Sequence, residues 1–243
     1  MNETNKSESI PPAEERKSNF QKMVTRFALV LMTGALIYAN FSLYPFAKTV
    51  SSKSVSLRPL SFEQKNNLNV AAQRLNGLVI RPGETFSFNA AVGPRTGKRG
   101  YQPAPSYLGA GGESPQTLGG GICLLSSCLY QNALAAGMPI VERVPHLRTV
   151  RTVPPGLDAT VWYGSADLRF KNQTDCPIQI KTEMSDAQLK VQLLGNSEAV
   201  AKSGNAELRR VEAMPAPGEL LVEVFRTERG KDIFVSRDLY RTR

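Results

Sequence analysis

The spacing of apolar residues predicts a helix over residues 61–75. Ser61 and Gln64 form the pattern of a capping box, in which two side chains satisfy backbone N–H groups at the start of a helix. The apolar residues that follow recur at helical spacing: Leu68, Ala71, Ala72 and Leu75. Asn76-Gly77 ends the segment, and the apolar face is expected to pack in the core.

A second segment typical of a helix runs from Leu124 to Ala136, after three consecutive glycines. Much of the remaining chain alternates between apolar and polar residues in short runs. The runs expected as strands are 85–89, 140–146, 149–153, 159–163, 167–171, 178–183 and 189–194. A hairpin is expected across residues 228–231. These patterns predict an α+β domain with a mainly antiparallel sheet, two main helices and a C-terminal β-hairpin.

Residues 27–47 contain no charged side chain and open on the apolar-rich run FALVLMTGALIYA. Their length covers most of a bilayer, which predicts a single-pass membrane anchor. The basic residues that precede this segment are Arg16, Lys17, Lys22 and Arg26. By the positive-inside rule they keep the N-terminus in the cytoplasm, so the domain after residue 48 is extracytoplasmic. A cleaved signal peptide is the alternative, although residues 1–26 are long for a signal.

Composition divides the rest of the chain. Residues 1–26 are polar and are expected to form a disordered cytoplasmic tail. Residues 48–60 are expected to be a Ser-rich connector and residues 61–195 one domain. Residues 196–217 have no clear periodicity and are expected to be a linker to the hairpin at 218–243.

The net charge of +9 and the pI near 9.6 favour an anionic neighbour. Nucleic acid, acidic lipid and anionic cell-wall polymer all fit that description. The sequence holds neither an RNA-binding motif nor paired Cys/His zinc ligands, so no nucleic-acid partner is expected. A solvated basic surface without a specific partner is the alternative.

The chain has three cysteines, and the predicted anchor places them where disulfides can form. Because three is odd, at least one thiol is unpaired within the chain. Cys123 and Cys128 are expected to point to different faces of one helix, which makes a bond between them unfavourable. A bridge between Cys128 and Cys176 stays open.

The segment Gly119–Gly121 runs into Cys123 at the predicted start of a helix, and the single histidine, His146, follows. The free N–H groups at a helix N-terminus favour a thiolate and can hold an oxyanion. His146 is the natural base because an imidazole titrates near neutral pH. Asp158 or Asp167 can orient it. The alternative is a tight turn beside a small buried cysteine.

A series of short motifs resembles the VanW family over residues 83–195. The motifs are GETFSFN at 83–89, VGPRT at 92–96, GY at 100–101, GGGIC at 119–123, LYQNAL at 129–134, ER at 142–143, PH at 145–146, VPPG at 153–156, DATV at 158–161 and DLRFKN at 167–172. Their number and order make the resemblance highly specific. Members are typically anchored or secreted proteins of bacterial envelopes, some of them similar to cysteine L,D-transpeptidases that cross-link peptidoglycan stems.

The resemblance implies that Cys123 is the nucleophile. The motif at 145–146 strengthens His146 as its base, and Asp158 is the expected orienting group. Five further residues are expected in oxyanion or substrate binding, with the arginines matched to a stem-peptide carboxylate: Gly120, Gly121, Tyr101, Arg143 and Arg148. The expected partners are peptidoglycan or its stem peptides, and the membrane through residues 27–47.

The chain departs from the family pattern at Leu124, where the family commonly has Gln. An amide can position substrate, whereas Leu cannot donate a hydrogen bond. Two hypotheses follow: a working acyltransferase with backbone donors, or a non-catalytic module that binds envelope material, linked to the cell wall or to the response to glycopeptide antibiotics. No cofactor and no metal are expected, and a zinc site of Cys123, His146 and Asp158 is a weaker alternative.

Overall fold

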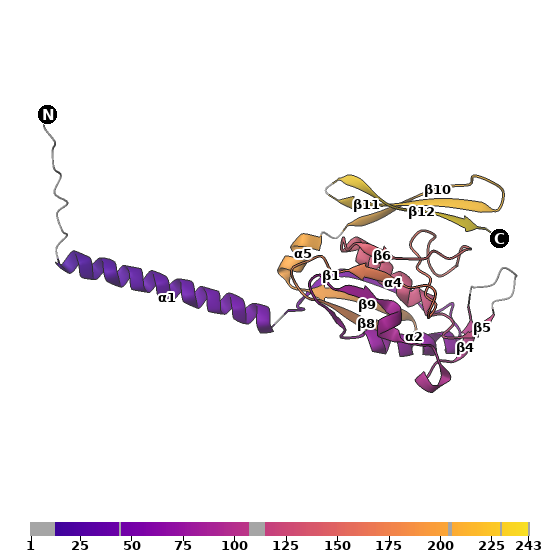
Figure 1. Ribbon diagram of the computed structural model, residues 1–243, viewed down its shortest axis with the longest axis horizontal. Helices are drawn as coiled ribbons and strands as arrows, with labels where there is room; N and C mark the ends of the chain where they lie inside the picture. Colours follow the sequence, from indigo (N-terminus) through magenta and orange to yellow (C-terminus); the bar gives the residue numbers. More distant parts are fainter. Residues whose placement is uncertain (1–12, 44, 107–114, 204–205, 229, 243) are drawn as a thin grey trace, which may run out of the picture. The chain divides into compact units, whose positions relative to one another are not determined.

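The computed structural model describes residues 13–43, 45–106, 115–203, 206–228 and 230–242 (Figure 1). The chain forms two compact units, residues 1–45 and residues 46–243. Within the described ranges, the first unit contains one helix, and every strand belongs to the second unit.

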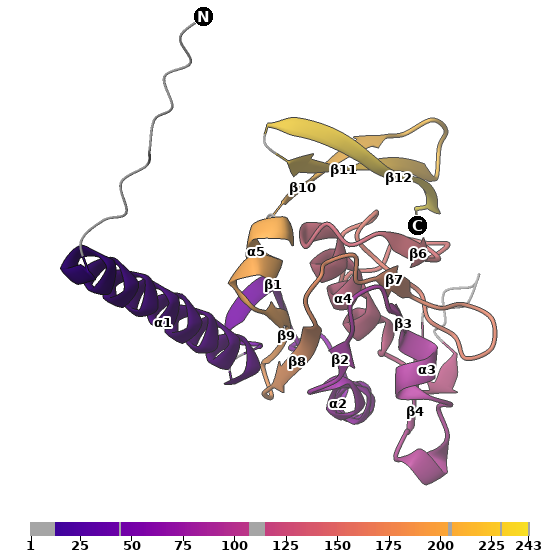
Figure 2. The same cartoon turned by 60° about the vertical axis from the view of Figure 1, so that its left-hand side comes forward.

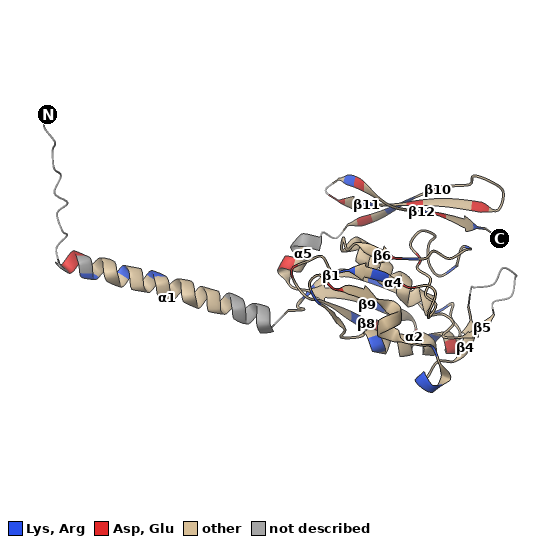
Figure 3. Cartoon of the chain, viewed as in Figure 1, with Lys and Arg blue, Asp and Glu red and all other residues tan. Residues whose placement is uncertain are grey.

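The helix of the first unit is α1 (Ala13–Leu43). Its charged residues gather in the N-terminal half, and residues 27–36 carry none (Figure 3). Part of the segment expected as a disordered tail is therefore helical, whereas residues 1–12 lie outside the described residues. No helix in the described part of the chain combines the length and the apolar character of a membrane span. This finding does not support the anchor expected at 27–47, which stays a prediction.

The central sheet of the second unit has four antiparallel strands in the order β1-β9-β8-β2 (Figure 1). Their bounds are β1 (Lys48–Ser56), β2 (Val79–Ile80), β8 (Ile178–Met184) and β9 (Gln188–Gly195). Strand β1 thus occupies most of the segment expected as a connector. Its frequent Ser and Lys suit an edge strand, which pairs on one side only and exposes much of its length.

Two helices pack on this sheet. The predicted capping box of α2 (Phe62–Leu75) is confirmed, because Ser61 Oγ accepts from the Gln64 N–H at 3.3 Å and Gln64 Oε1 accepts from the Ser61 N–H at 3.0 Å. Helix α2 packs against β8 and α4. Helix α4 (Cys123–Ala135) packs against β1 and β9 and is buried on nearly all sides.

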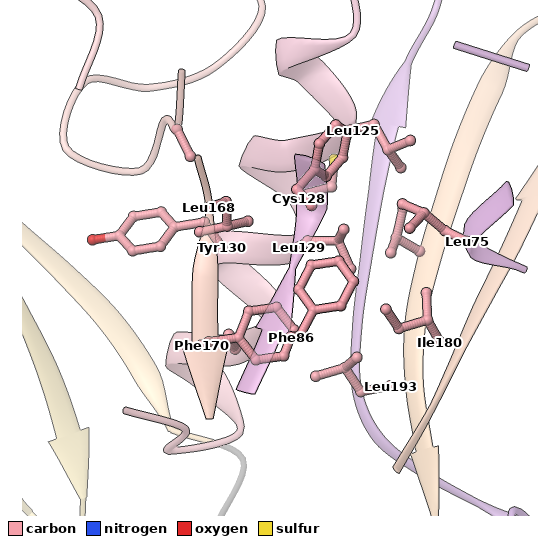
Figure 4. Close-up of a cluster of buried hydrophobic side chains, with 14 of the residues drawn as sticks. Leu75, Phe86, Leu125, Cys128, Leu129, Tyr130, Leu168, Phe170, Ile180 and Leu193 are labelled. Carbon is pink, nitrogen blue, oxygen red and sulfur yellow. The ribbon is translucent and has the colours of Figure 1, made fainter. Parts of the chain in front are cut away.

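The core lies between these helices and the strands. Figure 4 shows side chains of α4 among those of α2 and the neighbouring strands: Leu125, Cys128 and Leu129 with Leu75, Ile180, Leu193, Phe86 and Phe170. Burial raises the pKa of the Cys128 thiol to about 12, so this cysteine behaves as a small apolar residue. All three cysteines are free, and no bond joins Cys128 to Cys176.

A second, three-stranded sheet has the order β3-β7-β6. Its strands are β3 (Thr85–Ser87), β6 (Ile140–Glu142) and β7 (Arg169–Lys171). The predicted strand at 85–89 is shorter in the structure, because Ser87 Oγ accepts from the Ala90 N–H at 3.0 Å and starts the short helix α3 (Phe88–Val92).

Irregular chain surrounds these elements. A 3₁₀ helix, η1 (Gly97–Arg99), precedes the strand pair β4 (Pro103–Pro105) and β5 (Gln116–Leu118). Residues 149–153 form no strand, and the expected strand at 159–163 is reduced to isolated bridges at Thr160 and Trp162. Alternation alone does not decide between a strand and an extended loop, because a strand also needs a neighbour with free backbone groups.

The C-terminal part forms a sheet in the order β10-β11-β12. Its strands are β10 (Glu207–Ala213), β11 (Glu219–Glu228) and β12 (Lys231–Arg241). The segment expected as a linker therefore contains β10 and the helix α5 (Ser197–Ser203). Figures 1 and 2 place this sheet on the side of the second unit where α4 and β6 lie.

These elements make the chain an α+β protein with mainly antiparallel sheets, as the sequence predicts. The described residues contain five α-helices, of which α2 and α4 are the longest in the second unit.

Candidate active site

A cavity of about 370 Å³ lies where the three glycines lead into α4. Cys123 is half-buried, is the first residue of the helix and lines this cavity. Gln64 of α2 and Leu124 of α4 also line it. The partly exposed rings of Trp162 and Tyr163 belong to its wall, which is otherwise mainly apolar.

Each of the three glycines before Cys123 meets a separate steric demand. Gly119 and Gly121 have φ angles of +83° and +97°, which L side chains rarely adopt. A Cβ on Gly120 would stand 2.2 Å from the carbonyl oxygen of Ala104, a backbone atom that cannot turn aside. The turn brings the chain close to β4 and fixes the position from which Cys123 starts the helix.

The N-terminus of α4 offers backbone donors beside the sulfur. Among the described residues, no hydrogen bond is found from the N–H of Gly121 or of Cys123, and both residues line the cavity. N–H groups at the first turn of a helix have no partner within the helix. These two amides are thus available to an oxygen that carries negative charge.

The structure brings Cys123, His146 and Asp158 together. His146 Nδ1 lies 2.6 Å from Asp158 Oδ2, and His146 lines the same cavity as Cys123 and interacts with its side chain. Because Asp158 occupies Nδ1, Nε2 is the nitrogen available to the sulfur. The His146 N–H also donates to Asp158 Oδ2 at 2.7 Å, which fixes the histidine backbone against the same carboxylate.

The pKa values of this pair move in opposite directions. Burial lowers the pKa of His146, but its hydrogen bond to Asp158 and its interaction with the Cys123 side chain outweigh burial and raise the pKa to about 9. Burial raises the pKa of Asp158, but the hydrogen bond from His146 and the charge of Arg143 lower it to about 2. At neutral pH the site therefore holds a carboxylate and an imidazolium.

Asp158 is surrounded by donors. Arg143 Nη2 lies 3.0 Å from Asp158 Oδ1, and the hydroxyl of Tyr240 donates to the same oxygen at 2.6 Å. Tyr240 Oη in turn accepts from the Gly156 N–H at 2.7 Å. The side chain of Asp158 is 1% exposed, so this set of donors is what allows a charged carboxylate to be buried there.

Arg143 links the carboxylate to the C-terminal sheet. Its Nη1 lies 2.5 Å from Asp238 Oδ2 of β12, and its Nε donates to the Asp158 carbonyl at 2.7 Å. The guanidinium also stands 5.0 Å from the centre of the Tyr130 ring. With its side chain 6% exposed and its donors engaged, Arg143 supports Asp158 and does not line the cavity.

Polar residues along the buried helix α4 hold the segment that carries Asp158. Gln131 Nε2 donates to the Leu157 carbonyl at 3.0 Å, and Ser127 Oγ accepts from the Ala159 N–H at 2.9 Å. These residues lie one helical turn apart on the face that begins with Cys123. The Cys123 thiol itself donates to the Val161 carbonyl at 3.8 Å. The register of residues 157–161 along α4 thus sets the place of Asp158.

The other residues expected in binding are more scattered. Gly120 and Gly121 line the cavity with Cys123, whereas Tyr101 and Arg148 do not belong to its wall. Tyr101 is buried, and the backbone of Arg148 forms an isolated β-bridge with that of Arg241 in the C-terminal sheet.

Asp167, the alternative orienting group, is engaged elsewhere. Its carboxylate accepts from Ser87 Oγ at 2.5 Å and from the Asn89 N–H at 2.8 Å, at the start of α3. Of the two aspartates, Asp158 is the one beside the imidazole.

Sequence reasoning missed several residues of the site. Arg95, Gln64, Trp162 and Tyr163 line the cavity, and Tyr240 and Asp238 support Asp158 from behind. Arg95 stood within the motif VGPRT, and Gln64 stood in the capping box, which indicates a helix start and not a site. The rest come from segments with no local sign of a functional role. In the described ranges, no group of three His, Cys, Asp or Glu side chains is placed to hold a metal ion.

The fold and the site define an α+β protein with a Cys–His–Asp arrangement at the N-terminus of a buried helix. Residues 63–194 match the family model described as VanW like protein, and the chain belongs to the VanW family.

Two relatives extend this finding. The chain is 38% identical over 162 residues to the uncharacterized protein YoaR of Bacillus subtilis, covering 66% of this chain and 51% of the relative. It is 33% identical over 154 residues to the vancomycin B-type resistance protein VanW of Enterococcus faecalis. This match covers 60% of this chain and 54% of the relative. The chain thus spans about half the length of these curated relatives. No solved structure matches it.

Proposed function

We propose that this chain is a cell-envelope protein that transfers acyl groups between peptidoglycan stem peptides, with Cys123 as nucleophile. The observation that carries the proposal is that Cys123 lines the same cavity as His146, whose Nδ1 lies 2.6 Å from Asp158 Oδ2. Cysteine acyl transfer needs a thiolate, a group that moves the proton and a third group that orients it. Membership of the VanW family and the similarity to a vancomycin-resistance protein support a role at the envelope.

The first half of the reaction forms a thioester. The Cys123 thiolate attacks the carbonyl carbon of a stem-peptide amide, and the oxygen gains negative charge that the amides of Gly121 and Cys123 can bind. His146 gives its proton to the leaving amine as the C–N bond breaks. The raised pKa of His146, about 9, keeps that proton on the imidazole at neutral pH.

The second half transfers the acyl group. An amine of a neighbouring stem attacks the thioester carbon, His146 accepts the proton of that amine, and the C–S bond breaks. The product is a cross-linked pair of stems, and Cys123 returns as a thiolate. Asp158 holds Nδ1 throughout, so that Nε2 faces both the sulfur and the reacting nitrogen.

The proposal includes a location. The expected anchor at residues 27–47 would hold the second unit outside the cytoplasm, where peptidoglycan lies. The net charge of +9 suits an anionic envelope polymer as neighbour.

A second candidate is a binding module without catalysis. It is favoured by Leu124, a buried apolar side chain in the cavity wall at the position directly after the nucleophile. Leu supplies no donor to the oxyanion or the substrate, so only backbone amides remain there. Such a module would hold wall material in the cavity without forming a thioester.

Replacement of the sulfur alone separates the two candidates. We expect Cys123→Ser to lower the cross-linking of purified muropeptides by about a thousandfold or more, while binding to isolated sacculi stays near that of the wild type. Cys176→Ser is the matched control, because it removes a thiol outside the cavity and should keep cross-linking. Sacculus binding by a wild-type protein that yields no cross-linked product would leave the binding module as the better account.

A further inference from the structure

Arg95 is the one charged residue besides His146 in the described wall of the cavity that holds Cys123. Its Nη1 donates to the Gly93 carbonyl at 2.8 Å. Its Nε and Nη2 atoms are buried, and neither finds a hydrogen-bond partner among the described residues. Buried donors are costly to leave unpaired, so an arginine kept in this state points to a partner that the free protein lacks.

Aromatic rings hold the guanidinium in place. Its central carbon stands 5.5 Å from the centre of the Phe88 ring and 5.8 Å from that of the Tyr163 ring. Phe88 is fully buried, whereas Tyr163 is 52% exposed and belongs to the cavity wall. Both contacts favour a cation, and Arg is the side chain that stacks in this way.

The glycine turn is shaped around the same side chain. A Cβ on Gly119 would lie 2.7 Å from Cγ of Arg95, in addition to the strain of its positive φ. The first glycine before the nucleophile therefore leaves room for Arg95. The stem of Arg95 therefore lies against the turn that leads into Cys123.

The charges around the cavity favour an anion. Its described wall contains Arg95 and His146 but no Asp or Glu. The acidic residue that interacts electrostatically with Arg95 is Asp167, whose carboxylate already accepts hydrogen bonds from Ser87 and Asn89. The two free nitrogens, Nε and Nη2, form the side-on fork of a guanidinium, whose parallel N–H bonds match the two oxygens of a carboxylate.

We propose that Arg95 is a substrate-binding residue that holds a carboxylate of the donor peptide next to the bond that Cys123 attacks. This inference rests on the proposed acyl transfer and names a chemical feature of its substrate. From the sequence, Arg143 and Arg148 were expected to bind this carboxylate. The inference assigns that role instead to Arg95, which lies in the cavity wall. A donor without a carboxylate near the scissile amide would bind poorly.

Two alkylating reagents test the anion site without any catalysis. Iodoacetate and iodoacetamide both alkylate the Cys123 sulfur with loss of iodide. Iodoacetate carries a carboxylate where iodoacetamide carries a neutral amide. The measured quantity is the ratio of their rates on Cys123, followed by peptide mass spectrometry. We expect Arg95→Met to lower the iodoacetate-to-iodoacetamide ratio about tenfold, the size of one charge-assisted hydrogen bond.

Two further variants separate the carboxylate fork from charge alone. Arg95→Lys should give an intermediate ratio, because it keeps the charge but not the fork. Arg151→Met is the matched control: this exposed arginine lies between two residues of the wall, Val150 and Thr152, but does not line the cavity itself. Its ratio should stay within about twofold of the wild type. An unchanged ratio in Arg95→Met, or an equal fall in Arg151→Met, overturns the inference.

A second experiment identifies the carboxylate. Tetrapeptide donors are compared with a free or amidated C-terminus, and with a free or amidated side-chain carboxylate. Amidation of the bound group should raise KM about tenfold for the wild type and have little effect on Arg95→Met. Equal KM values for all donors overturn the inference and leave acyl transfer standing. A wild type that consumes no donor but keeps its Arg95-dependent alkylation ratio removes the proposed function instead. If neither reagent labels Cys123, both the inference about Arg95 and the proposed acyl transfer are overturned.

Discussion

Arg95 lies in the wall of the cavity and Arg143 lies behind Asp158, outside that wall, and the surroundings of the two arginines differ. Arg143 bonds to Asp158 and Asp238 and stands over Tyr130, with its donors pointing into the protein. Arg95 lies near two aromatic rings, with Nη1 engaged and two buried nitrogens, Nε and Nη2, unpaired. The Arg143 guanidinium completes a hydrogen-bond network within the chain, whereas the Arg95 guanidinium keeps two nitrogens without a partner among the described residues.

The difference separates support from recognition. A charge that is buried with all its partners holds its neighbours in place, and its loss is felt in stability. A buried donor without a partner contributes little to stability and is suited to a ligand. Position in the sequence points the other way, because Arg143 lies three residues from His146 while Arg95 lies far from it. The predictions that follow test this division of roles.

The largest effect is expected for Arg143→Met. The substitution leaves Asp158 and Asp238 without their shared cation, and removal of one partner from a buried ion pair costs about 3–5 kcal/mol. We expect the free energy of unfolding, measured by urea denaturation, to fall by this amount. Lys181→Met, which breaks the exposed pair with Glu183, is the control and should change it by less than about 1 kcal/mol. Equal losses in the two variants would contradict the role of Arg143 as support.

The next largest effect is expected in the pH dependence of the free energy of unfolding. Since the pKa of His146 is raised from 6.5 to about 9, its contribution is fully present below pH 6.5 and is lost as pH rises through 9. A shift of this size corresponds to a contribution on the order of 3 kcal/mol. The difference in unfolding free energy between wild type and His146→Gln should therefore shrink from pH 6 to pH 10. A difference that is constant over this range excludes the coupling to Asp158 and Cys123.

Tyr240→Phe is expected to have a smaller effect. The substitution removes the donor to Asp158 Oδ1 and leaves the Gly156 N–H without its acceptor. The cost of such buried unpaired groups is about 1–3 kcal/mol. We expect a loss of stability in this range and a slower alkylation of Cys123. Tyr163→Phe serves as control, because its ring faces the cavity and is half exposed. If Tyr240→Phe matches this control, the Tyr240 hydroxyl has no part in orienting the carboxylate.

The smallest effect on stability is expected for Arg95→Met. Met keeps much of the apolar stem beside the two rings, and the change removes one hydrogen bond, to the Gly93 carbonyl, and two nitrogens that had no partner. We expect the unfolding free energy to stay within about 1 kcal/mol of the wild type, while the binding of anionic reagents falls. Thermal unfolding of wild type, Arg95→Met and Arg143→Met in one buffer makes the comparison. A loss as large as that of Arg143→Met would show that Arg95 is structural.

Local signals in the sequence predicted the fold well. The capping box at Ser61 and Gln64 and the turn at Asn76 act within a few residues of the chain, so their physics is visible in sequence. Strand β1 was missed because its serines and lysines give a weak apolar pattern, and its pairing partner, β9, lies over 100 residues away. An edge strand takes its stability from that partner rather than from its own composition.

The candidate site was predictable only in part. Cys123 and His146 stand in short motifs, whereas the choice between Asp158 and Asp167 depends on the register of residues 157–161 along α4. The support from Tyr240 lies outside residues 63–194, and nothing near it in sequence indicates it. Long-range contacts of this kind need the fold to be known.

The most direct test of the central claim is an intact-mass measurement on the protein incubated with a purified disaccharide tetrapeptide. The account predicts that wild type gains the mass of the acyl group, located by peptide mapping on Cys123. Cys123→Ala should gain none, and Asp158→Asn should gain it more slowly because the imidazole loses its orienting charge. A wild type that never gains this mass, while iodoacetamide labels Cys123 readily, would contradict the assignment of Cys123 as an acyl-transfer nucleophile.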